Sequence, residues 1–227
     1  MTVQDIVTRV RAAIDELMGN DASFITSSED EQNLTRIIVD KIGYALQDVI
    51  ENAPIEKLDN SLFDTLSQTE EAGFSIDATS LVAQLKLPAD LLRIIVARLS
   101  SWSQSPIPEN DNSQVYLMQQ DQYARGSWDR PVSILTNHGK DRYLEMYSAK
   151  TASDTLNFSF IRKPQMPTVD VTSPSSMTNA TVTVPSMLEE ALVYQVAGLT
   201  MVAFKDDSAS MFFAIAQKNL GIEIPEQ

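Results

Sequence analysis

The chain contains no cysteine, one histidine and seven glycines among its 227 residues. The absence of cysteine excludes disulfide bonds, a thiol nucleophile and cysteine-ligated metal sites, and it is typical of a protein made in a reducing cytoplasm. One histidine does not supply the nitrogen-rich ligand sets that zinc prefers. The few glycines form none of the GxxxxGK, GxGxxG or GxSxG patterns that hold phosphates or a serine nucleophile. We therefore expect no cofactor, no bound metal and no enzymatic activity.

Basic residues are scarce, because 17 Lys and Arg stand against 31 Asp and Glu, which gives a net charge of −14. Free-standing nucleic-acid-binding proteins need clustered Lys and Arg to displace counterions from phosphates, so the sequence argues against this class. The acidity is uneven: residues 1–75 hold 15 acidic and 5 basic side chains. An acidic surface repels nucleic acid and keeps a concentrated protein soluble.

Long hydrophobic runs are also missing. The N-terminal stretch carries Asp5, Asp15 and Glu16 and has no apolar signal core. The longest apolar stretch, Ala191 to Phe204, is too short to cross a bilayer and is interrupted by Gln195. We expect it to be a buried helix and expect no membrane association.

Helical periodicity is clear at the N-terminal side. Apolar residues recur at helical spacing from Val3 to Leu17, after a Thr2 that can cap the helix and before a Gly19 in the C-cap position. A second helix follows the capping-box pair Ser28 and Glu31 and ends before Pro54, because the residue before proline leaves the helical region. These helices are predicted to form a hairpin. Residues 55–80 give a weaker signal, for a short helix or an irregular arm.

The middle of the chain predicts β-structure. Val82–Leu87 and Leu92–Leu99 are rich in Val, Ile and Leu, and Pro88 would break a continuous helix between them. A short helical segment is expected at residues 113–120. The further expected strands are Pro131–Thr136, Arg142–Ser148 and Thr155–Arg162, the first two joined by a hairpin turn at residues 137–140.

The C-terminal part predicts an arm followed by two helices. Lys163 to Ser176 contains three prolines among small polar residues, which is typical of a linker or extended arm. The helices are expected at Met187–Phe204 and from Asp206–Ser208 towards Gly221. A pair of helices buries only one seam, whereas two pairs close a four-helix core. We therefore predict an α+β fold: N- and C-terminal helices form a bundle around an inserted antiparallel β-meander. The expected divisions are 1–75, 76–165 and 166–227.

Catalytic alternatives are few. His138 lies in the predicted hairpin turn, and a hydrolase built on it would need a carboxylate such as Asp141 and a serine in contact. The acidic clusters have simpler explanations than a metal or glycosidase site. Residues 29–31 and 206–207 complement helix N-termini, and residues 70–71 are expected to face solvent.

Several phrases of the chain resemble the head-to-tail connector, or adaptor, proteins of short-tailed bacterial viruses, most closely those of crAss-like phages of Bacteroidales. The phrases are LPADLLRIIVARLSSW, VYLMQQDQY, RPV, YLEMYSAKT, the strand end at residues 162–164 and VPSMLEEALVYQVAGLT, which together fall within residues 80–220. They are structural phrases, not catalytic motifs. The resemblance implies a virion protein of the head–tail junction, made in the host cytoplasm. Such adaptors form a ring, typically of about twelve copies, beneath the portal protein. The ring continues the DNA channel and carries further tail or ring proteins, and the genome passes through without specific binding.

Nine residues are the candidates for scaffold or interface roles. Pro88 and Asp90 are expected to set a tight turn, with Asp90 bonding nearby backbone amides. Arg93 is expected to be paired within the sheet or across a subunit boundary. Gln119, Arg130 and Pro131 are expected to fix the loop that enters the next strand. The remaining candidates are aromatic anchors of a core or an interface: Trp102, for which a core position is favoured, Tyr116 and Trp128.

A second hypothesis is a soluble binding module whose acidic face mimics nucleic acid and sequesters a basic host protein. In the adaptor hypothesis the same acidity, if it lines the channel, lets DNA slide without sticking; ordinary solubility explains it equally well.

Overall fold

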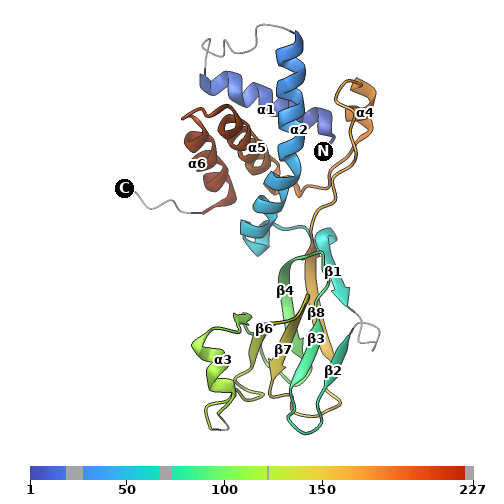
Figure 1. The fold of residues 1–227 in the computed structure, drawn as a ribbon, viewed down its shortest axis with the longest axis vertical. Helices are drawn as coiled ribbons and strands as arrows, with labels where there is room; N and C mark the ends of the chain where they lie inside the picture. The colour runs from blue at the N-terminus through green and yellow to red at the C-terminus, as the bar shows by residue number, and fades with distance from the viewer. Residues whose placement is uncertain (19–27, 67–72, 122, 223–227) are drawn as a thin grey trace. The chain divides into compact units, whose positions relative to one another are not determined.

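A computed structural model describes residues 1–18, 28–66, 73–121 and 123–222. The chain divides into two compact units, a helical unit of Met1–Asn60 with Pro164–Gln227 and a β unit of Ser61–Lys163. The α+β class is confirmed, because helices from both ends of the chain form one unit and the strands lie between them in sequence (Figure 1). The first division falls earlier than residue 75, because residues 63–66 belong to the β unit as a strand.

The helical unit is built around α5. This helix packs against α1, α2 and α6, and its buried side chains include Leu192, Val196 and Met201. The α-helices of the unit are α1 (Val3–Met18), α2 (Ser28–Asn52), α4 (Pro174–Asn179), α5 (Glu189–Phe204) and α6 (Ala209–Leu220), with 3-10 turns at Ile55–Lys57 and Ser186–Leu188. A further 3-10 turn, Asn60–Leu62, falls at the unit boundary.

The helix ends follow their sequence signals. Thr2 caps α1 reciprocally with Asp5: the Asp5 N–H donates to the Thr2 hydroxyl at 3.1 Å, and the Thr2 N–H donates to the Asp5 carboxylate at 3.2 Å. The α2 helix ends before Pro54 as predicted, and α6 ends at Gly221, whose φ of 80° is the left-handed conformation of a glycine C-cap. The predictions for Gly19, for the side chain of Ser28 and for residues 70–71 lie outside the described residues.

The expected α1–α2 hairpin is replaced by a crossing. Figure 1 shows α1 lying across α2, and both helices pack on α5. The physical reason is that α5 is apolar almost all round, so it offers each of them a separate face to bury.

The arm predicted at residues 163–176 is present up to residue 173, and its last three residues belong to α4, which begins at Pro174. Residues 163–173 form neither helix nor strand, and Met166 lies against Gly43 of α2. A Cβ atom at Gly43 would stand 2.9 Å from the Met166 Cγ, so the missing side chain lets the arm approach the helix.

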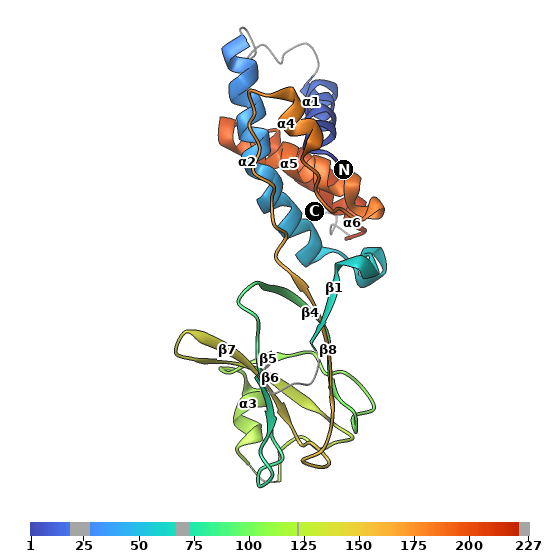
Figure 2. The same cartoon turned by 90° about the vertical axis from the view of Figure 1, so that its right-hand side faces the viewer.

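The β unit contains two sheets (Figures 1 and 2). One has the order β1-β8-β4 and the other β2-β3-β7-β6-β5. Their strands are β1 (Phe63–Leu66), β2 (Phe74–Ile76), β3 (Ala83–Lys86), β4 (Leu91–Leu99), β5 (Glu109–Asn110), β6 (Val132–His138), β7 (Asp141–Tyr147) and β8 (Leu156–Arg162). A short helix, α3 (Gln114–Gln119), precedes β6. All pairs are antiparallel except β5 with β6.

The inner faces of the two sheets share one apolar core. Phe158 and Phe160 of β8 are fully buried together with Leu85 of β3 and Leu144 of β7. Alternation along each strand places these residues on one face. The core therefore fixes the register of strands that come from distant parts of the sequence.

The expected strands and the β6–β7 hairpin are present, but the strand order departs from a simple meander. The Pro88 turn carries the chain from β3 in one sheet to β4 in the other, and residues 148–155 carry it from β7 to β8 in the same way. Gly139, with a φ of 67°, makes the tight hairpin turn. The strands β1 and β2 were not predicted, because each is short and β1 pairs with a strand far away in sequence.

Candidate interaction surfaces

The α3 helix is held in place by its own polar side chains. The Ser113 hydroxyl caps the helix by accepting from the Tyr116 N–H at 3.2 Å. The Gln119 side chain is buried, donates to the Val115 carbonyl at 2.9 Å and accepts from the Gly126 N–H at 2.9 Å. Gln119 therefore ties α3 to the loop that leads into β6.

That loop turns tightly before β6. Ser127 and Arg130 exchange two backbone hydrogen bonds, of 3.1 Å and 2.9 Å, and Pro131 is buried where the strand begins. The Ser127 hydroxyl donates to the Asp129 carboxylate and lowers the pKa of that group. A Cβ atom at Gly126 would stand 3.0 Å from the Arg130 carbonyl oxygen, so the turn closes directly over this glycine.

A series of hydrogen bonds continues from this loop to the core of the β unit. The Gly126 carbonyl accepts from the Ser148 hydroxyl, and the Ser148 carbonyl accepts from the Trp102 indole N–H at 3.2 Å. Trp102 is only 3% exposed, so the core position favoured by the sequence is its place in the structure. Ser148 has a φ of 69°, a left-handed conformation that is costly outside glycine and needs support from its surroundings.

Replacing Gln119 with leucine tests the role of this tie. The variant keeps a side chain of similar size but leaves the partly buried Gly126 N–H without its acceptor, which costs about 1 kcal/mol. We expect faster hydrogen exchange at the Gly126 amide and a lower melting temperature of the β unit. Gln120→Leu, at the exposed neighbouring position, is the matched control. Equal exchange rates in the two variants would contradict the role given to Gln119.

Three exposed apolar or aromatic side chains, here together called the α3 surface, lie on α3 and in the loop that follows it: Leu117, Met118 and Tyr123. These side chains are 63%, 45% and 96% exposed. Trp128, which is 48% exposed, lies in the following loop. The Nζ atom of Lys150 stands over its ring, 4.8 Å from the ring centroid. Exposed aromatic and large apolar side chains are typical anchors of protein contacts.

The remaining candidates have structural surroundings within the β unit. Tyr116 is partly buried, and Arg93 is partly buried on β4 opposite Ile161 of β8. The Pro88 carbonyl accepts from the Leu91 N–H at 3.2 Å and closes the expected turn.

The Asp90 carboxylate pairs with the Arg162 guanidinium at 3.0 Å and 2.8 Å, where the sequence predicted backbone amides as its partners. This pair lowers the pKa of Asp90. Arg162 also binds Asp64 at 2.8 Å, so it joins β1 and the Pro88 turn to β8. No local sequence pattern predicts these two ion pairs, because Asp64, Asp90 and Arg162 lie in three separated segments.

His138 is exposed at the end of β6. Its Nε2 atom lies 3.5 Å from the Glu145 carboxylate and 3.4 Å from the Thr136 hydroxyl, and Glu145 accepts from the Tyr147 phenol at 2.7 Å. Burial, followed by this contact, raises the pKa of Tyr147. Asp141, the carboxylate considered for a hydrolase, instead pairs with Lys86 at 2.7 Å. The partner for His138 in such a mechanism would therefore have to be Glu145.

The helical unit has a groove between α2 and α5, here called the α2–α5 groove. It has a volume of about 380 Å³ and is lined by Lys41, Tyr44, Leu199, Val202 and Ala203. Tyr44 is 70% exposed and Val202 is 52% exposed, although both are apolar or aromatic residues. A neighbouring groove of about 430 Å³ lies on the other side of Tyr44, between α2 and the arm at Met166.

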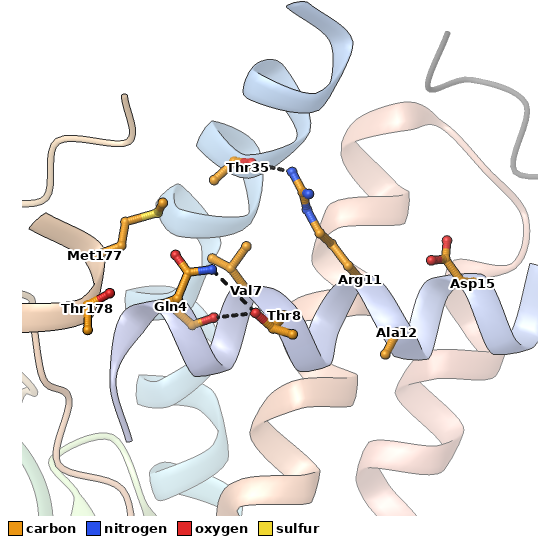
Figure 3. Close-up of a pocket in the computed structure, with 9 residues that line it drawn as sticks. All are labelled: Gln4, Val7, Thr8, Arg11, Ala12, Asp15, Thr35, Met177 and Thr178. Atoms are coloured by element: carbon orange, nitrogen blue, oxygen red, sulfur yellow. Dashed lines mark hydrogen bonds between the residues drawn. The ribbon is translucent and has the colours of Figure 1, made fainter. Parts of the chain in front are cut away.

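A third hollow, of about 560 Å³, lies where α1, α2 and α4 meet (Figure 3). Arg11 crosses from α1 to α2, where it donates to the Glu31 carbonyl at 3.0 Å and to the Thr35 hydroxyl. Its Nε atom is buried without a hydrogen-bond partner among the described residues. Gln4, Thr8 and Thr178 line the same hollow, which therefore offers hydrogen-bond donors to an acidic group or a carbonyl group.

The stretch Ser186–Phe204, which includes α5, is long and apolar enough to cross a membrane by length and composition, and half of it is buried inside the helical unit. Core helices have the same composition. Arg9 of α1 binds Glu189 at 3.0 Å and also binds Glu190. Both glutamates lie at the N-terminal end of α5. In the described part of the chain, no group of three or more His, Cys, Asp or Glu side chains is placed to hold a metal ion.

No protein-family model matches this sequence, and no curated protein matches it significantly.

Proposed function

We propose that the chain is a virion structural protein that forms an adaptor ring between portal and tail and extends the DNA channel. The observation that carries this proposal is the pair of exposed apolar surfaces, the α3 surface on the β unit and the α2–α5 groove on the helical unit. A ring needs heterologous contacts, in which each copy presents two different surfaces. The two surfaces lie on different units, so each copy presents two distinct patches.

Two further features support the proposal. The arm at residues 163–173 contains neither helix nor strand, and such segments suit contacts with adjoining proteins, here the portal or further tail proteins. The net charge of −14 repels phosphates, so genomic DNA passes the ring without specific binding.

The direct test is native mass spectrometry and electron microscopy of purified particles. We expect the chain in the virion as a closed ring at the head–tail junction, in contact with the portal. A chain that stays monomeric under all conditions and is absent from particles contradicts the proposal. A stable complex with a basic host protein, together with absence from particles, would instead favour the acidic binding module.

A further inference from the structure

We infer that the α2–α5 groove of one copy binds the α3 surface of the next copy. The inference rests on the proposed ring and assigns the surfaces that join its neighbouring subunits. Its occupant is a second copy of this chain, bound by side chains of α3 and its following loop.

The first argument is the composition of α5. From Ala191 to Phe204 the helix has no charged residue, and its apolar side chains point in every direction. A helix that is apolar all round is normally covered on all sides. Here α1, α2 and α6 cover separate faces of the helix, while Leu199, Val202 and Ala203 remain at the groove. The side of α5 that carries these three residues is therefore not covered by another helix of the unit.

The second argument is the form of the α3 surface. Leu117 and Met118 project from a short helix that Ser113 caps and Gln119 ties to the loop. A helix that presents apolar anchors in a fixed orientation fits a groove between two other helices. Because the helix is already held, little side-chain and loop entropy is lost on binding.

The third argument is charge. Copies with a net charge of −14 repel each other, so a contact between them needs locally opposite charges. The groove side carries Lys41 on α2 and the exposed Lys205 at the C-terminal end of α5. Asp111 and Asp121 precede and follow α3 in the sequence, and the Asp121 carboxylate accepts from the Tyr123 N–H at 2.9 Å. Rim charges of this kind select the orientation and the partner more than they add affinity.

The size of the surfaces sets the strength of the contact. A groove of about 380 Å³ holds a few side chains, and a stable interface buries about 1,000 Å² or more. We therefore expect the isolated protein to associate weakly. Docking on a portal brings the copies together at high effective concentration, and each copy is then held by two neighbours.

The absence of native cysteine allows a test without background crosslinks. Val202→Cys places a thiol in the groove and Leu117→Cys places one on the α3 surface, both at exposed positions that tolerate the change. A mixture of the two single variants, treated with a short bismaleimide, should give heterodimers only. The double variant should give a ladder of covalent oligomers that ends at the ring. The control is a mixture of the Val202→Cys and Ser153→Cys variants. Ser153 is exposed and remote in sequence from both surfaces.

The reaction is run on purified particles and on concentrated protein, which separates this inference from the proposed function. Particles that contain the ring but give no crosslink between positions 117 and 202 overturn the inference and leave the ring proposal standing. Crosslinks in concentrated protein, with the chain absent from particles, support the contact and contradict the adaptor function. Homodimers of the Val202→Cys variant would show an isologous contact and overturn the inference. Protection of α5 by lipid vesicles, without crosslinks in either preparation, would overturn it in favour of a membrane.

Discussion

Replacing Gly198 with valine will destabilise the helical unit by about 2–3 kcal/mol. Gly198 lies on the buried side of α5, where a Cβ atom would stand 2.5 Å from Cε1 and 2.7 Å from Cδ1 of Phe213 on α6. These distances are far shorter than van der Waals contact, so the helices must separate or the ring must leave its position. We expect the loss in urea unfolding followed by far-UV circular dichroism, together with faster hydrogen exchange in α5 and α6.

A double-mutant cycle isolates this contact. In the native sequence Gly198→Ala gains helix propensity of about 1 kcal/mol but meets the Phe213 ring, so it should be neutral or destabilising. In a Phe213→Ala background the ring is gone, and the same change should stabilise the unit. The nearest three atoms to the added Cβ all belong to Phe213, which makes the expected change of sign specific. An equal loss in both backgrounds would show that the α5–α6 spacing does not depend on this glycine.

Periodicity and capping were sufficient to predict α1, α2, α5 and α6, because these signals are local, whereas the short helix α4 falls partly in the segment predicted to be an arm. The Thr2 cap and the stop before Pro54 lie within a few residues of the bonds that they control. The distribution of strands over two sheets was not predictable in this way. The pairing of β4 with β8 joins residues near 95 to residues near 160, and only the shared apolar core determines it.

The candidate surfaces were predictable in part. Trp102 and Trp128 were both recognised as anchors, and the structure buries the first and exposes the second. The α2–α5 groove was missed because its members are ordinary apolar helix residues. Their exposure depends on which sides of α5 the other helices cover, and no local pattern records this. Asp90 was placed correctly in a turn, whereas its partner Arg162 lies 72 residues away.

Replacing Trp102 with alanine will have the largest effect on the β unit, about 3–5 kcal/mol, because the side chain is 3% exposed and fills the shared core. Hydrogen exchange of β3, β7 and β8 should rise together in this variant. Trp128→Ala is the matched control, since Trp128 is 48% exposed and contacts the ammonium group of Lys150. That change should cost less than about 1 kcal/mol.

Trp102→Phe separates packing from hydrogen bonding. The variant keeps most of the ring volume but loses the indole N–H that donates to the Ser148 carbonyl. Ser148, held at a φ of 69°, in turn binds the Gly126 carbonyl, and Gly126 binds Gln119 of α3. We therefore expect a loss of about 1–2 kcal/mol in the β unit. Faster exchange at Gly126 and a lower yield of the crosslink between positions 117 and 202 should accompany it. Unchanged exchange at Gly126 would show that the core does not position α3, and the α3 surface would then be fixed by Gln119 alone.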